Sequence, residues 1–114
     1  MLNPIAGRVE QYMDLVAARQ KVTASNIANV DTPGYKTKDI DFSSALNDAA
    51  GAGSANLTSR ATPVENLPGR PDGNTVSLDR EARNLAENAL RFHIAGQLVQ
   101  NQIRLTRTAM LEIR

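Results

Sequence analysis

Hydrophobic residues near the start of the chain recur every three or four positions, the spacing of one face of an α-helix. This stripe, which includes one threonine, comprises Ile5, Val9, Tyr12, Val16, Thr23, Ile27 and Val30. Asn3 suits a helix N-cap, and Pro4 suits the first helical position, where a missing N–H costs nothing. The pattern therefore predicts an amphipathic helix from Pro4 to about Asn29, roughly 40 Å long at the usual rise per residue.

The last part of the chain carries a longer stripe with heptad spacing. This heptad stripe comprises Ala82, Leu85, Ala89, Phe92, Gly96, Val99, Ile103, Thr106, Met110 and Ile113, and a second stripe beside it comprises Ala86, Leu90, Ile94, Leu98 and Leu105. Ser77 or Asp79 is expected to cap the helix, and Glu81 places a negative charge in its first turn, where the helix dipole favours it. Because the apolar surface is wider than a two-stranded coiled coil needs, we expect this helix to contact more than one neighbour.

Between the two helical patterns the composition changes to small and polar residues. Residues 43–72 are dominated by Ala, Ser, Asn and Gly with three prolines, which is typical of a flexible linker. Within it, residues 43–50 are expected to form a short helix. We predict an all-α fold in which two long terminal helices pack as a coiled-coil-like hairpin, joined by an irregular loop with a short extended or hairpin-like segment. The single domain divides into residues 1–42, 43–72 and 73–114.

Composition argues against several classes of function. The 114 residues include 13 Lys and Arg against 12 Asp and Glu, so no strong field attracts nucleic acid or anionic lipid. The absence of cysteine removes disulfides, thiolate zinc sites and thiol catalysis. No run approaches the roughly 18 apolar residues of a membrane span, and we expect no cleaved secretory signal because the first residues lack its basic-then-apolar order.

Few residues suggest catalysis or metal binding. His93 is the only histidine, and beside the heptad stripe it is expected to be a packed or rim residue rather than a general base. Asp39 and Asp41 are two apart, but calcium needs six to eight oxygens and nothing nearby completes such a set. We expect the pair on a short extended segment whose other face carries Ile40 and Phe42. The sequence predicts no enzyme, no cofactor, no metal and no small-molecule substrate.

A dense polar motif ends the first predicted helix. Residues 25–36 read SNIANVDTPGYK. The residue before Pro33 leaves the helical region, and Gly34 accepts a positive φ, so the motif predicts a type II turn. Asn26 and Asn29 lie three apart on one helical face, and buried amides there require hydrogen-bond partners.

This motif resembles the N-terminal signature of bacterial flagellar axial proteins, the family of rod, hook and hook-filament junction proteins. The segments DIDF at 39–42 and DGNTVSLDRE at 72–81 resemble its proximal rod members. The resemblance covers residues 3–42 and 72–114, and the middle of the chain is shorter than the family implies. It implies long terminal helices that pack together and against neighbouring subunits into a tube around a protein-export channel.

The resemblance also implies two groups of assembly residues. The signature turn and the segment behind it comprise Asn26, Asn29, Thr32, Pro33, Gly34, Tyr35, Asp39, Asp41 and Phe42. The packing residues of the last helix comprise Leu85, Ala89, Phe92, Val99, Ile103, Met110 and Ile113. We expect Met110, Leu111 and Ile113 to insert into a neighbouring subunit. Arg104, Arg107 and Arg114 suit the helix C-terminus as a solvated face, and they are also placed to touch acidic neighbours.

The implied function is that of a structural subunit of the flagellar basal body, in the proximal rod. Such a subunit assembles helically, connects the export gate and MS ring to the distal rod, and transmits torque for motility. The expected partners are other copies of the chain, other rod proteins (FlgC-like, FliE-like and FlgF-like), the export gate and the MS ring, with no nucleic acid. The expected location is the rod in the periplasmic space, reached through the flagellar type III exporter without a cleaved signal.

Two alternatives remain at the level of sequence. The first is another rod protein of the FlgC-like type, which shares the N-terminal signature. The second is a small regulatory helical hairpin that dimerises and binds a partner through its arginine-bearing face. Helicity that is independent of concentration in a discrete dimer would favour the second alternative.

Overall fold

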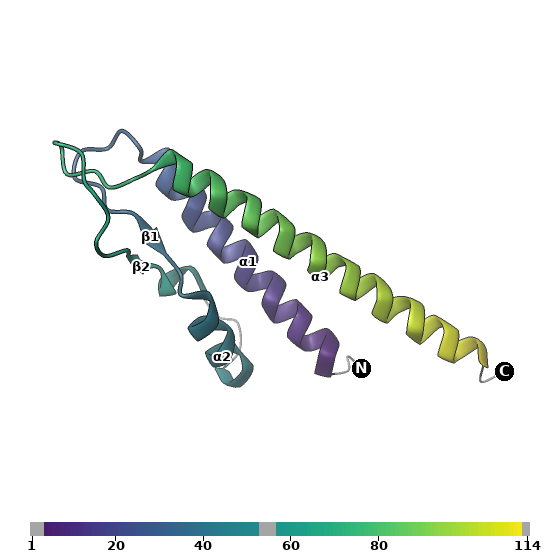
Figure 1. The fold of residues 1–114 in the computed structure, drawn as a ribbon. Coiled ribbons are helices and arrows are strands. Elements are labelled where there is room, and N and C mark those ends of the chain that lie inside the picture. Colours follow the sequence, from purple (N-terminus) through teal and green to yellow (C-terminus); the bar gives the residue numbers. More distant parts are fainter. Residues whose placement is uncertain (1–3, 53–56, 113–114) are drawn as a thin grey trace.

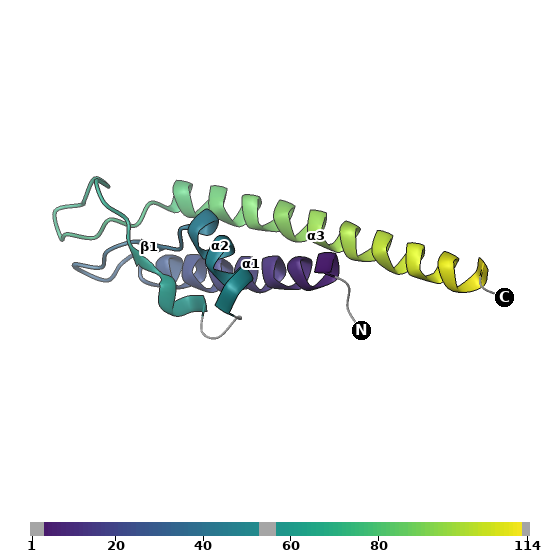
Figure 2. The ribbon, with the colours of Figure 1, turned by 90° about the horizontal axis from the view of Figure 1, so that it is seen from below.

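The molecule is a long helical hairpin with a shorter segment packed along one side (Figure 1). The computed structural model describes residues 4–52 and 57–112, with principal extents of 69 × 26 × 19 Å. Helices α1 (Pro4–Ala28) and α3 (Leu78–Glu112) run antiparallel and side by side in both views (Figures 1 and 2). The elements between them are β1 (Lys38–Asp39), α2 (Phe42–Ala52), the 3₁₀ turn η1 (Leu57–Arg60) and β2 (Thr62–Pro63). The predicted mostly helical hairpin is confirmed.

Both long helices begin where the sequence predicts. Helix α1 starts at Pro4, while the proposed cap Asn3 lies outside the described residues. At the start of α3, the Ser77 hydroxyl accepts a 3.3 Å hydrogen bond from the Arg80 N–H, and the Ser77 carbonyl accepts one of 3.0 Å from Glu81. Ser77 is therefore the N-cap of α3.

The two helices differ in length. Helix α1 has 25 residues and α3 has 35, which correspond to about 37 Å and about 52 Å at 1.5 Å per residue. Figure 1 shows α3 continuing well past the start of α1. The last buried residue on α3 is Ala95, so the described residues beyond it have little cover within the chain.

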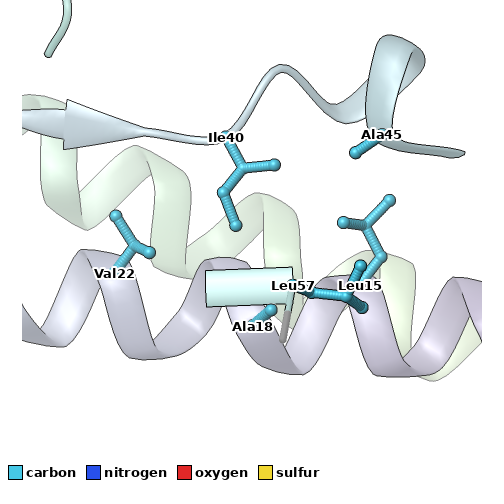
Figure 3. Close-up of a cluster of buried hydrophobic side chains, with 6 residues drawn as sticks. All are labelled: Leu15, Ala18, Val22, Ile40, Ala45 and Leu57. Carbon is cyan, nitrogen blue, oxygen red and sulfur yellow. The ribbon is translucent and has the colours of Figure 1, made fainter. Parts of the chain in front are cut away.

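The hydrophobic core lies between α1 and the middle segment rather than between the two long helices. Figure 3 shows its six side chains: Leu15, Ala18, Val22, Ile40, Ala45 and Leu57. The short helix expected at residues 43–50 is present as α2, but η1 and β2 also hold regular structure in the segment 43–72, whose composition is typical of a linker. The face of α1 that carries Leu15 and Val22 is buried by this segment. Because of that burial, the core includes residues of α1 outside the predicted stripe. Two members of the stripe, Val16 and Thr23, are also buried.

A two-stranded antiparallel ribbon brings the middle segment back onto α1. Strand β1 pairs with β2 in the register Lys38 with Pro63 and Asp39 with Thr62. Next to this pair, the Val64 N–H donates a 2.9 Å hydrogen bond to the carbonyl of Thr37. The ribbon places Ile40 in the core, as expected for the apolar face of a short extended segment.

The face of α3 that meets α1 is not the heptad stripe. This inner face has four buried residues: Glu81, Asn84, Asn88 and Ala95. Each of the four precedes a member of the heptad stripe by one position, which is a rotation of about 100° around the helix. The heptad stripe is consequently turned outward: Phe92, Ile103 and Met110 are 43%, 54% and 66% exposed. In the described part of the chain, no helix combines the length and apolarity needed to cross a membrane.

Candidate assembly site

The signature turn has the predicted geometry. Helix α1 ends at Ala28, and the Tyr35 N–H donates a 3.2 Å hydrogen bond to the Thr32 carbonyl, which closes a four-residue turn around Pro33. Gly34, the third residue of that turn, has φ of +74°. A positive φ at this position defines a type II turn and favours glycine, so the prediction for Gly34 is confirmed.

A second tight turn packs directly against the first. The Gly73 N–H donates a 2.8 Å hydrogen bond to the Arg70 carbonyl, and Gly73 has φ of +84°. The Gly34 N–H donates a 2.9 Å hydrogen bond to the Asp72 carbonyl, which joins the two turns. A Cβ atom at Gly73 would lie 3.5 Å from the Gly34 Cα. The turns therefore approach each other through two glycines.

Asn74 ties the second turn to the end of α1. Its buried amide nitrogen donates to the carbonyls of Asn29 and Thr32 at 2.9 and 2.8 Å. Its side-chain oxygen accepts a 2.8 Å hydrogen bond from the Val76 N–H. Asn74 lies in the DGNTVSLDRE segment, but the sequence does not indicate these partners. In the structure it adds a second hydrogen bond to two carbonyls that already accept from the backbone N–H groups of Thr32 and Tyr35.

Residues after the two turns continue this pairing as a short ladder. The Thr75 N–H donates to the Tyr35 carbonyl at 3.0 Å, and the Thr37 N–H donates to the Thr75 hydroxyl at 2.8 Å. The Lys36 ammonium donates a 2.6 Å hydrogen bond to the Gly73 carbonyl. The segment after α1 and the segment before α3 are thus held together by backbone and side-chain contacts.

Asn26 is the polar centre of the loop end of the hairpin. Its amide nitrogen donates to Glu81 Oε1 at 2.6 Å and to the Lys38 carbonyl at 2.8 Å. Its oxygen accepts from the Lys38 N–H at 3.1 Å and from the Tyr35 hydroxyl at 3.2 Å. All four hydrogen-bonding positions of a primary amide are therefore filled. The expectation that this buried asparagine needs partners is confirmed.

The side chain of Asn29, the second asparagine of the motif, makes local contacts only. Its amide nitrogen donates to the Ser25 carbonyl at 2.8 Å, and its side-chain oxygen accepts from the Thr32 hydroxyl at 3.0 Å. These bonds stabilise the last turn of α1 and the start of the signature turn. They do not reach α3.

Asp39 joins two arginines from the two long helices. Its Oδ1 lies 3.1 Å from Nε of Arg19 on α1, and its Oδ2 lies 3.0 Å from Nη2 of Arg80 on α3. Arg80 also contacts the fully buried Glu81 at 3.1 Å. Both carboxylate oxygens of Asp39 are thus engaged in ion pairs, which accounts for this acid without a metal ion. Among the described residues, no group of three or more acidic or histidine side chains is arranged to hold one.

Arg19 extends this network along the inner face of α3. Its guanidinium donates to Glu87 at 2.9 Å, to Asn84 at 3.1 Å and to Asn88 at 3.4 Å. Burial disfavours the charge of Arg19, but hydrogen bonds and charge from Asp39 and then Glu87 outweigh burial and raise its pKa. Burial likewise acts to raise the pKa of Glu87, but Arg19 and then Arg91 outweigh it and lower that pKa. The helices of the hairpin are therefore joined by charged and polar contacts.

Phe42 and Asp41 position the start of α2. The Phe42 ring meets Tyr12 edge-on, with centroids 5.3 Å apart, and the Arg91 guanidinium lies 4.1 Å from the Phe42 centroid. The Asp41 carboxylate accepts a 3.4 Å hydrogen bond from the Ser44 N–H, in the manner of an N-cap. Phe42 thus bridges both long helices, and Asp41 fixes the helix that follows it.

The structure separates the two predicted groups of residues. The residues of the signature turn, with Asn26 and Asp39, lie around the loop end of the hairpin near residues 70–81, whereas Asp41 and Phe42 lie at the start of α2. The packing residues of α3 lie outside the inner face, with Leu85 half-buried and Ala89 exposed, and Ile113 falls outside the described residues. Sequence reasoning missed Arg19, Asn84 and Asn88. The four-residue spacing of the two asparagines on the last helix was the available signal.

Exposed hydrophobic side chains are concentrated on one element. Among the described residues, all the large hydrophobic side chains that are exposed belong to α3: Leu78, Leu90, Phe92, Ile94, Leu98, Val99, Ile103, Leu105, Met110 and Leu111. Extended apolar surface of this kind marks contact sites in soluble proteins. A polar inner face and an apolar outer surface define the character of this hairpin.

Comparison with known proteins identifies the class to which this hairpin and signature turn belong. A family model described as flagella basal body rod protein matches residues 13–36, which span the second half of α1 and the signature turn. Together with the relatives described next, this match makes the chain a structural component of the flagellar basal body rod and not an enzyme, as predicted.

Full-length relatives define the family more narrowly. Proteins named flagellar basal body rod protein FlgB are 34% identical in Yersinia ruckeri and 38% identical in Yersinia enterocolitica, each over 91% of this chain and 93% of the relative. The protein of that name in Escherichia coli (strain K12) is 36% identical over 83% of this chain and 84% of its own length. The chain belongs to the FlgB family of flagellar basal body rod proteins. The first two alignments span 128 positions, more than the 114 residues here, so those relatives carry insertions relative to this chain.

Proposed function

We propose that the chain is a proximal rod subunit that assembles helically with copies of itself and with other rod proteins. In this role it connects the export gate and MS ring to the distal rod and transmits torque. The FlgC-like, FliE-like and FlgF-like rod proteins are its proposed neighbours. The observation that carries the proposal is the location of the exposed hydrophobic side chains on α3, which the hairpin itself leaves uncovered.

The distribution of contacts suits a mechanical role. Obligate interfaces bury large apolar areas, and α3 presents such area on two flanks of its inner face. When one surface of a subunit binds a different surface of the next, repetition gives an open helical array. Many small packing contacts along such helices must break together before the array twists or shears.

The same distribution suits export as a loosely folded chain. The hairpin seam is polar, and the apolar core involves α1 and the short middle segment only. A single copy therefore buries little apolar area between its long helices, and neighbours supply the rest on assembly. We propose passage through the flagellar type III exporter and a final location in the periplasmic part of the rod.

The signature residues have a proposed role that their contacts support. Asn26, Gly34 and Tyr35 fix the shape of the loop end, and Asp39 and Phe42 fix the middle segment against both helices. We assign these residues to shaping the end of the subunit that meets the next rod protein. Leu85, Ala89, Phe92, Val99, Ile103, Met110 and Ile113 are assigned to packing against neighbours.

Circular dichroism combined with sedimentation velocity on the purified chain, over a wide concentration range, tests the proposal. Low helicity in the monomer that rises as larger species form is the expected result. Full helicity in a discrete monomer or dimer at every concentration would contradict it and favour a self-contained binding module. In cells, a strain that lacks the chain is expected to lose swimming and to regain it when the chain is supplied.

A further inference from the structure

A groove opens beside the start of α1, on the side where α2 lies. Six of its lining residues come from three helices: Arg8, Val9, Tyr12, Leu46, Ile94 and Leu98. Its volume is about 570 Å³. The groove is open to solvent and is the continuation of the exposed second stripe of α3, because Ile94 and Leu98 belong to both.

The chemistry of the groove suits an apolar helix better than a small polar ligand. Arg8 is the only charged side chain that lines it. Gln11 and Asn47 are polar, and the other lining residues are aliphatic or aromatic. Ligand sites for small molecules combine an apolar wall with several convergent polar groups. An amphipathic helix that lays its apolar face in a groove needs only hydrophobic walls and a charge at the rim.

The terminal segment of α3, residues 99–112, has the matching surface. Leu105 and Glu112 are seven residues apart and share one face of the helix, and Leu105 is 66% exposed. Glu112 is the only acidic residue that follows Glu87 in the chain. Within residues 4–52 and 57–112, neither Glu112 nor Arg8 forms an ion pair. The face of the terminal segment therefore offers a leucine and a carboxylate to a groove that offers apolar walls and a guanidinium.

The terminal segment of a given copy does not reach the groove of that same copy. Helix α3 is continuous from Leu78 to Glu112, and Figure 1 shows it leading away from the region where α1 begins. The groove and the segment are different surfaces of one chain, so their contact links one copy to the next without closing a ring by itself.

We propose that the terminal segment of α3 docks into the groove of a second copy of the chain, with Leu105 against the apolar walls and Glu112 paired with Arg8. The inference rests on the proposed function, because it requires that copies of the chain assemble. It assigns the exposed end of α3 to one defined acceptor surface on the next subunit.

Disulfide cross-linking tests this contact cleanly because the chain has no cysteine. Val9→Cys places a thiol in the groove of one population, and Leu105→Cys places one on the terminal segment of another. Mixing the two under mild oxidation during assembly is expected to give a disulfide-linked dimer that neither variant gives alone. Ala17→Cys, exposed on the side of α1 turned away from the groove, is the matched control and is expected not to link to Leu105→Cys.

Charge reversal provides a second measurement on the full-length chain. Arg8→Glu alone and Glu112→Arg alone are each expected to weaken self-association about fivefold, the upper range for an exposed ion pair. The double variant is expected to recover most of that loss. Both side chains are exposed, so the circular dichroism spectrum at matched assembly state is expected to remain unchanged.

Different results separate this inference from the proposed function. Self-association of the unaltered chain with no Val9–Leu105 cross-link overturns the docking proposal and leaves the rod function in place. If the thiol of Val9→Cys is alkylated equally before and after assembly, no second copy covers the groove. That result also overturns the docking proposal. Absence of self-association at any concentration contradicts the helical self-assembly in the proposed function itself.

Discussion

Asn26 on α1 donates a 2.6 Å hydrogen bond to the carboxylate of Glu81 on α3, which has no exposed surface. These residues are 55 positions apart in the chain and meet at the loop end of the hairpin. A purely apolar seam tolerates sliding by a heptad, whereas sliding here would leave a buried carboxylate without its partners. The pair therefore specifies the register of the two long helices.

Removal of this amide is expected to destabilise the hairpin. Asn26→Ala deprives Glu81 of a hydrogen bond and leaves the Lys38 backbone groups unpaired, so we expect a loss of about 2–4 kcal/mol in the free energy of unfolding. Urea unfolding followed by circular dichroism at fixed protein concentration measures it. Asn29→Ala, which loses only local bonds, is the control, with an expected loss of about 1 kcal/mol. Equal losses for both variants would contradict the assignment of register to Asn26.

The signature turn makes a separate prediction about backbone conformation. Gly34 has φ of +74°, a region that a β-branched residue rarely adopts, so Gly34→Val is expected to cost about 1–3 kcal/mol. Swimming in soft agar and the yield of assembled rods are expected to fall. Gly7→Ala, at a helical position with open space around the added carbon, is expected to retain both. A motile strain with normal rods and Gly34→Val would show that the turn does not need this geometry.

Acidification is expected to weaken the contact between Glu87 and Arg19. The pKa of Glu87 is lowered in the folded chain, so its stabilisation is present above the unfolded pKa of about 4.5 and is lost as pH falls through the folded value. The side chain is 46% exposed, so solvent screening keeps the effect small. As the pH falls below about 4.5, the urea midpoint of the chain is expected to decrease more steeply than that of Glu87→Gln. Parallel curves for the two proteins would contradict this, and Glu65→Gln, at an exposed position, serves as the control.

Loss of the end of α3 is expected to affect assembly and not the hairpin. A chain that ends at Thr108 lacks Met110 and Leu111, both exposed, and keeps Ala95, the last buried residue of the helix. We expect its unfolding in urea, measured at matched assembly state, to change little, while self-association in sedimentation velocity and swimming are lost. Normal swimming with this truncation would rule out insertion of Met110, Leu111 and Ile113 into a neighbour.

Substitution of an exposed hydrophobic residue is expected to affect assembly, whereas substitution of a buried one is expected to affect folding stability. Ile103→Ser removes an exposed side chain, so the free energy of unfolding of the dissociated chain should change by no more than about 0.5 kcal/mol, while assembly weakens. Leu15→Ala removes a fully buried side chain and is expected to cost about 2–5 kcal/mol. Comparing urea unfolding with sedimentation for both variants separates folding from assembly. A large loss of monomer stability in Ile103→Ser would place this residue in the core instead.

Local pattern was sufficient for much of the fold. Spacing of apolar residues predicts both long helices, and proline and glycine chemistry predicts the type II turn at Gly34. The inner face of α3 was not predictable in this way, because the pattern method assumes that apolar residues are buried and here Glu81, Asn84 and Asn88 are buried instead. The core partner Leu57 was equally hard to assign, since it is an isolated hydrophobic residue in a polar stretch.

The candidate assembly site shows the same difference between what local pattern predicts and what only the folded chain reveals. The sequence indicates that Asn26 needs partners, but those partners come from Lys38 and Glu81, which only the folded chain brings near. Arg19 lies among apolar positions of α1 with no pattern to distinguish it from a solvated arginine. Pairings that depend on distant segments are outside the reach of local spacing.

The unequal lengths of the two long helices have a mechanical consequence. Helix α3 has 35 residues and α1 has 25, and the difference corresponds to a projection of about 15 Å at 1.5 Å per residue. If subunits stack end to end, such a projection spans the boundary between successive layers, as the overlap does in a lap joint. A joint of this kind leaves no flat plane along which a shaft shears, and its strength grows with the length of overlap.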